Sequence, residues 1–107
     1  MRVMEFLNHN GSSPFANWFD DLDSQAAAKV AVAVTRMEQG NLSNVKGLGG
    51  GLFEYRLAFG PGYRIYLGKD GNTIVVLLGG GTKRRQQSDI DTARLHWAEY
   101  KHRKKEH

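Results

Sequence analysis

The segment Glu54–Ile90, EYRLAFGPGYRIYLGKDGNTIVVLLGGGTKRRQQSDI, decides the fold of this chain. Its apolar residues alternate with polar ones or form short continuous runs, as they do in β-strands that face a core. We predict three strands, Leu52–Phe59, Tyr63–Leu67 and Thr73–Leu78, of which the last is the most apolar. Gly60-Pro61-Gly62 and Asp70-Gly71-Asn72 are typical of tight connections. Strands joined so closely run antiparallel, so the segment predicts a meander.

Several cationic side chains lie on or directly after the predicted strands, and the packing of a core does not require them. Arg56 and Arg64 lie on predicted strands, and Lys83-Arg84-Arg85 follow the last strand. An arginine that projects from a sheet needs an anionic partner such as phosphate or a carboxylate. Two interpretations of Arg56 and Arg64 stay open: they bind an external anion, or they pair with Glu54 or a helix carboxylate of the same chain.

Residues before this segment predict one more strand and a helical hairpin. Arg2–Phe6 is a short apolar strand. Ser13 followed by Pro14 is typical of a helix start, and this helix ends near Asp21. Asp23 or Ser24 caps a second helix that runs to about Glu38. The glycine-rich stretch Val45–Gly51 predicts a loop or a bulged edge strand, because no helix follows its Gly-x-Gly.

The C-terminal quarter predicts a last helix. Ser88-Asp89-Ile90-Asp91 resembles a capping box, and the helix runs to about Tyr100 or beyond. Ile90, Ala93, Trp97 and Tyr100 form its apolar stripe. The fold class is therefore α+β, with an N-terminal strand and a helical hairpin on one face of an antiparallel sheet. We expect the other face to stay partly open and to be lined by Arg56, Arg64 and Tyr66.

Size and charge restrict the function further. The 107 residues predict a single domain 1–107, and the chain has no cysteine, so thiolate chemistry and cysteine-based zinc sites are excluded. Residues 1–82 carry seven basic and seven acidic side chains, whereas residues 83–107 carry eight and four. The net charge of +4 thus lies at the C-terminal end, including a basic tail at about 101–107. This asymmetry favours an acidic partner, or else a solvated helix with a basic tail.

Other motifs predict little chemistry. Gly79-Gly80-Gly81-Thr82-Lys83 lacks the order of a phosphate loop, and we interpret it as a wide turn between strand and helix. The histidines do not form a pair with metal-binding spacing, so no metal site is expected. His96 is a possible general acid or base, but we favour the simpler interpretation that it is a partly exposed residue of the last helix. Tyr66 is a candidate for stacking on a nucleobase.

Several of these elements together resemble the RelE/ParE toxin superfamily. The residues that carry the resemblance are Lys46-Gly47-Leu48-Gly49, Glu54-Tyr55-Arg56, Gly60-Pro61-Gly62-Tyr63-Arg64-Ile65-Tyr66, Leu77-Leu78-Gly79-Gly80-Gly81-Thr82-Lys83 and Asp89-Ile90. The chain is most similar to the HigB-like addiction module killer branch, which is related to phage Gp49-like proteins. The resemblance implies a cytoplasmic toxin of a bacterial type II toxin–antitoxin pair. It also implies a ribosome-dependent mRNA endonuclease without metal or other cofactor.

The resemblance implies partners as well. They are the ribosome with its mRNA and a cognate helix-turn-helix antitoxin, similar to HigA, that neutralises the toxin by direct binding. Operator DNA would be bound only through the antitoxin complex, and no membrane is involved.

The same resemblance assigns roles to single residues. Arg64, Arg84, Lys83 and Arg56 correspond to the basic catalytic positions, and Lys46, Arg85 and Tyr66 are expected to contact RNA. Two positions depart from the pattern, because Ala58 and Ile90 stand where related nucleases carry a basic residue and a proton-transfer residue. These departures leave room for a ParE-like toxin that inhibits DNA gyrase by binding, or for a degenerate toxin that serves as a regulatory partner.

Overall fold

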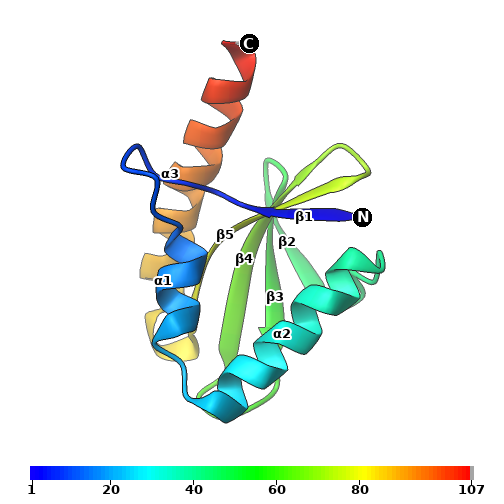
Figure 1. The fold of residues 1–107 in the computed structure, drawn as a ribbon, viewed down its shortest axis with the longest axis vertical. Coiled ribbons are helices and arrows are strands. Elements are labelled where there is room, and N and C mark those ends of the chain that lie inside the picture. Colours follow the sequence, from blue (N-terminus) through cyan, green and yellow to red (C-terminus); the bar gives the residue numbers. More distant parts are fainter. Residues whose placement is uncertain (107) are drawn as a thin grey trace.

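The computed structural model describes residues 1–106, which form three α-helices, five strands and one short 3₁₀ helix (Figure 1). The elements are β1 (Arg2–Glu5), α1 (Pro14–Asp20), α2 (Ser24–Glu38), β2 (Val45–Gly49), β3 (Leu52–Leu57), β4 (Tyr63–Asp70), β5 (Ile74–Thr82), η1 (Lys83–Arg85) and α3 (Gln86–Lys105). The predicted α+β class is confirmed, as are the C-terminal helix and the bulged edge strand β2, whose pairing shifts between Gly47 and Gly49.

The five strands form one mixed sheet in the order β1-β5-β4-β3-β2. The predicted meander is confirmed for β2 to β5, in which each strand runs antiparallel to the next. The expectation of a wholly antiparallel sheet is wrong, because β1 pairs in parallel with β5. The helical hairpin and three strands intervene between β1 and β5, so β1 joins the sheet by a crossover rather than by a turn.

The hairpin of α1 and α2 covers one face of this sheet, as predicted (Figure 1). Ser13 caps α1 by accepting a hydrogen bond from the Ala16 amide at 3.0 Å, and Asp23 caps α2 in the same way through the Ala26 amide at 2.8 Å. The core on this side consists of Phe15, Val30, Ala33, Met37, Tyr55, Ile65, Leu67, Val75 and Leu77. Each helix therefore starts at its predicted cap and contributes side chains to this core.

The opposite face is covered by α3 rather than left partly open. Trp97 packs over Gly68 and donates a hydrogen bond from Nε1 to the Gly50 carbonyl at 2.7 Å. The expectation that Arg64 and Tyr66 line an open face is wrong, because only 7% and 1% of their surfaces are exposed. The covering helix buries Leu52, Tyr66, Val76 and Leu78 together with its own Ala93 and Trp97.

The glycines at 79–81 belong to β5 and do not form the predicted wide turn. They pair with Tyr66, Ile65 and Arg64 of β4. Their lack of side chains makes room for groups from both layers, since a Cβ at Gly80 would overlap the Trp18 ring and one at Gly81 would overlap the Asp89 carboxylate. Glycine here serves close packing on a strand rather than chain reversal.

The last helix begins earlier than predicted. It starts at Gln86, directly after η1, and its N-cap Arg85 makes no side-chain capping bond, so the capping box at Ser88 does not start the helix. Because η1 is itself a helical turn and α3 follows it directly, the chain is already helical before Ser88. The helix extends through most of the predicted basic tail to Lys105, while the tail's last residue, His107, lies outside the described residues.

We expect Gly80→Ala to destabilise the protein by about 1–3 kcal/mol, because the added methyl group would force the Trp18 ring off the strand. Urea unfolding at neutral pH measures the change. Gly47→Ala is the matched control, since its Cβ would meet Phe53 at an ordinary 3.6 Å. The Trp18→Ala background should remove most of the cost at position 80, and equal costs in both backgrounds would contradict the packing explanation.

Candidate functional site

Strand register brings several of the predicted site residues onto the face that α3 covers. Lys46 of β2 pairs with Glu54 of β3, which pairs with Tyr66 of β4. One row along, Arg56 pairs with Arg64. Directly paired residues of an antiparallel sheet project to the same side, so these five side chains lie on one surface of the sheet.

Glu54 is the centre of this group. Its carboxylate is fully buried and accepts hydrogen bonds from Arg56 Nε at 2.7 Å and from Gln86 Nε2 at 2.8 Å. Arg64 Nε lies 3.8 Å from the same carboxylate. Burial raises the pKa of Glu54, but the hydrogen bonds from Arg56 and Gln86 and the charges of both arginines outweigh burial and hold its pKa below the usual value.

The two arginines beside Glu54 differ in access. Arg64 is buried and donates a hydrogen bond from Nη1 to the Gly62 carbonyl, while its Nε has no hydrogen-bond partner among residues 1–106. The Arg56 side chain is 49% exposed. Intramolecular pairing with Glu54, one of the two predicted alternatives, is therefore present for both, and Arg56 also faces solvent.

The cations of η1 begin next to this pair. A Cβ added at Gly62 would lie 3.0 Å from Arg64 Nη1 and 3.3 Å from Lys83 Cβ, so both side chains flank Gly62. Lys83, Arg84 and Arg85 are exposed, as is Lys46. Within the described part of the chain, none of these four forms an ion pair.

We call Lys46, Arg56, Lys83, Arg84 and Arg85, together with the buried Arg64, the cationic surface. Its exposed members are the residues that an external anion can reach. A guanidinium binds a phosphate through two parallel hydrogen bonds, and lysines add charge without fixed geometry. The arrangement can therefore bind a polyanion along η1 and the edge of β2 and β3.

The other two predicted site residues are placed differently. The Tyr66 ring is buried, so it is not available to stack on a base as predicted. Burial, followed by the charges of Glu54 and Asp89, raises the pKa of its hydroxyl far above the usual value. His96 stacks on Phe6 with ring centroids 4.9 Å apart, and burial lowers its pKa. Neither side chain belongs to the exposed cationic surface.

Sequence reasoning named Glu54 as a possible partner of the two arginines but missed Gln86 as its third partner. Glu54 and Arg56 are two residues apart on one strand, which puts them on the same face and makes their pairing predictable from the spacing. Gln86 gives no such signal, because its contact with Glu54 depends on where α3 begins.

Residues 1–106 contain neither a metal-binding cluster nor a membrane-spanning helix. No cluster of three or more histidine, cysteine, aspartate or glutamate side chains is suitable for a metal ion. No helix in this range is both long and apolar enough to span a membrane.

Comparison with known proteins identifies one relative by sequence. No family model matches the chain. It is 38% identical over 82 residues to a protein of Haemophilus influenzae strain Rd that is named only as an uncharacterized protein. The match covers 76% of this chain and 83% of the relative. The chain belongs to the same family as that protein. The match covers most of both chains and is therefore not confined to an isolated motif.

We expect Glu54→Gln to lower the free energy of unfolding by about 3 kcal/mol at pH 7, because it leaves the buried Arg64 without a counter-charge. Urea unfolding measures the loss. The matched control is Glu99→Gln, which removes a partly exposed ion pair with Arg103 and should cost no more than about 1 kcal/mol. Equal losses in the two variants would contradict the central role of Glu54.

The difference between wild type and Glu54→Gln should depend on pH. The pKa of Glu54 is lower in the folded protein than its ordinary value of 4.5, so the stabilisation is complete above 4.5 and is lost as pH falls through the folded pKa. Unfolding free energies of both proteins between pH 7 and pH 3 test this expectation. Other carboxylates titrate equally in the two proteins, so a difference that stays constant down to pH 3 would contradict it.

Proposed function

We propose that this protein is a toxin of a bacterial type II toxin–antitoxin pair with a RelE/ParE-like fold, of the HigB-like branch. The α+β architecture is compatible with this proposal, and so is the position of the Gly60–Tyr66 motif at the turn into β4. The proposed activity is ribosome-dependent cleavage of mRNA in the cytoplasm, without a metal or another cofactor.

The observation that carries the proposal is the cationic surface. Four of its side chains, Lys46, Lys83, Arg84 and Arg85, are exposed and unpaired within residues 1–106, and Arg56 is half exposed. A protein has no folding reason to gather unpaired cations, because they repel one another. A polyanionic partner such as RNA reverses this cost by placing a phosphate between them.

The proposed reaction needs charge stabilisation above all. The 2′-hydroxyl of RNA gives up its proton to water and attacks the adjacent phosphate, so negative charge builds up on the phosphorane. The bond to the 5′-oxygen of the next nucleotide then breaks, that oxygen takes up a proton from water, and a 2′,3′-cyclic phosphate remains. In this mechanism Arg84 contacts the phosphorane, the buried Arg64 contributes its charge from beside Gly62 without contact, and Arg56, Lys83, Lys46 and Arg85 hold the RNA backbone. Glu54 positions Arg56 through their 2.7 Å hydrogen bond.

The proposed partners follow from the resemblance to the same toxin superfamily. They are mRNA on the ribosome and a helix-turn-helix antitoxin of the HigA type, with operator DNA bound only through the antitoxin complex. The basic surface suits both RNA and the acidic surface of a neutralising protein.

A second candidate function is inhibition of a protein target such as DNA gyrase. A specific observation favours it: the exposed cationic surface contains no histidine, tyrosine or carboxylate among its members, whereas Glu54 and Tyr66 are buried. A surface of cations alone can bind an acidic protein, but it offers no exposed group that transfers a proton.

We expect the protein to arrest growth and to produce A-site cuts in translated mRNA, detected by primer extension. Arg84→Ala should reduce cutting about a hundredfold, because it removes one donor to the phosphorane. Arg84 is exposed and forms no ion pair within residues 1–106, so folding should be unaffected. Lys105→Ala is the control, since Lys105 is an exposed cation at the opposite end of α3 from η1.

Three outcomes separate the candidates. Cuts that are lost in Arg84→Ala and kept in Lys105→Ala support the ribonuclease. Growth arrest with intact mRNA overturns it, and loss of supercoiling by purified gyrase at micromolar protein then supports the second candidate. Absence of growth arrest on overexpression would contradict both and would favour a regulatory partner that has lost toxicity.

A further inference from the structure

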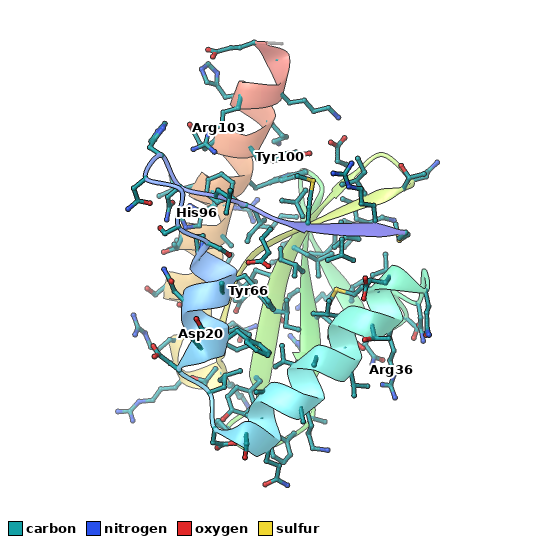
Figure 2. All side chains as sticks on the ribbon, viewed as in Figure 1. Asp20, Arg36, Tyr66, His96, Tyr100 and Arg103 are labelled. Carbon is teal, nitrogen blue, oxygen red and sulfur yellow. The ribbon has the colours of Figure 1, made fainter. Side chains whose placement is uncertain are left out.

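A small cavity lies on the other side of Tyr66, between the start of α1 and the N-terminal half of α3. Its volume is about 100 Å³, and it communicates with solvent. The lining residues are Pro14, Tyr66, Leu78, Gly79, Gly80, Asp89, Thr92, Ala93 and His96. Figure 2 shows Tyr66 and His96 on the side of the molecule where α1 lies. The lining includes none of the cationic side chains described above, although Arg85 is close enough for its charge to act on Asp89.

Tyr66 contributes a polar atom that the fold leaves unsatisfied. The residue is 1% exposed, and its hydroxyl lies near the Glu54 carboxylate but forms no hydrogen bond of good geometry among residues 1–106. A buried hydroxyl without a partner costs roughly 1–3 kcal/mol. Natural folds rarely accept that cost, and a phenylalanine would fill the same space without it.

Asp89 contributes a carboxylate that is also unpaired. It forms no hydrogen bond and no ion pair within the described part of the chain. Its charge is felt by nearby groups, since Arg85 opposes the effect of burial and Asp89 in turn raises the pKa of Tyr66. Burial nevertheless dominates and raises the pKa of Asp89 above its usual value.

The inward direction of Asp89 is built into the fold. Its carboxylate lies against Gly81, where any side chain would collide with it. A negative charge in the first turn of α3 is favoured by the helix dipole, but a solvent-facing carboxylate would serve that purpose equally. The fold therefore holds a partly exposed carboxylate against the sheet with no partner among residues 1–106, which is typical of a binding site rather than of a structural ion.

We propose that this cavity binds a single organic cation, a guanidinium or a primary ammonium group. The Asp89 carboxylate supplies the counter-charge, and the Tyr66 hydroxyl oxygen accepts a second hydrogen bond from the cation. His96 is the remaining titratable group in the lining, and because burial disfavours its protonated form it does not oppose a cation at neutral pH.

The size and the donor set favour an organic cation over a metal ion. A cavity of about 100 Å³ accommodates a planar guanidinium with little spare room. One carboxylate and one hydroxyl fall short of the six or more oxygens that a hard divalent cation requires. The cation can be a free small molecule or the tip of an arginine or lysine side chain of a partner protein, since the cavity is open on one side.

The test is a titration of the full chain, followed by amide chemical shifts in NMR spectra. The probes are guanidinium chloride and methylammonium chloride up to 50 mM, at constant ionic strength with sodium chloride. We expect saturable shifts at Gly79, Gly80, Asp89 and Thr92. Asp89→Asn should weaken binding at least tenfold, and Tyr66→Phe several-fold. Asp91→Asn, an exposed carboxylate on the same helix, is the matched control and should bind as the wild type does.

Two further arms make the result decisive. Binding should be lost as pH falls and Asp89 is protonated, and a guanidinium isotherm that is unchanged at pH 4 would overturn the proposal. Equal affinity of Asp89→Asn and wild type, or shifts that do not saturate, would also overturn it.

The short peptides Gly-Arg-Gly and Gly-Lys-Gly distinguish the two sources of the cation. Tighter binding of a peptide than of its free cation assigns the cavity to a partner's side chain. Weaker binding assigns it to a free small molecule. Both Asp89→Asn and Tyr66→Phe keep the side-chain volume, and thermal unfolding verifies that they fold.

Discussion

The interaction on which the rest of the structure depends is the buried carboxylate of Glu54. It accepts hydrogen bonds from Arg56 on its own strand and from Gln86 on α3, and it neutralises Arg64 on β4. Three elements thus meet at one charge that has no contact with solvent. An ion that deep in a small domain is unfavourable unless every partner is present, so the strand register and the start of α3 must be correct together. The cluster specifies how α3 lies on the sheet, which an apolar stripe alone would leave less strictly defined.

This central ion divides the cations of the chain into two kinds. Arg64, and in part Arg56, are used to balance Glu54 and are therefore structural as much as functional. Lys46 and the three cations of η1 are left with solvent as their only partner within residues 1–106. An external anion binds most favourably to these four exposed cations, because no ion pair within the protein has to be broken first. The buried Arg64 acts on such an anion indirectly, by fixing the backbone at Gly62, which lies beside Lys83 of η1.

Much of this fold could be predicted from local sequence signals. The caps at Ser13 and Asp23, the alternation in β3 and the turn at Asp70-Gly71-Asn72 depend on neighbours in the chain, and each is found as predicted. The failures have a common cause in contacts that are distant along the chain. Glycines 79–81 are typical of a turn until Trp18 and Asp89 are known to pack on them. Arg64 and Tyr66 appear exposed by pattern until Trp97 places α3 over the same face. The parallel pairing of β1 with β5 depends on a crossover that no local motif encodes.

The candidate site, like the fold, has one part that contacts within the chain explain and one part that they do not. The carboxylates of Glu54 and Asp89 illustrate the two parts. Glu54 and Asp89 both lie near Tyr66, and both raise the pKa of its hydroxyl. Their own pKa values shift in opposite directions, because Glu54 has a full set of partners and Asp89 has none within residues 1–106. The charge of Glu54 is explained by the fold that it stabilises. Asp89 is partly exposed and is held against the sheet by a glycine that leaves room for it, with no partner among residues 1–106, so a cation from outside the chain would supply the partner that the fold does not. Asp89, rather than the more conspicuous arginines, is therefore the residue of this domain whose environment the fold alone does not explain.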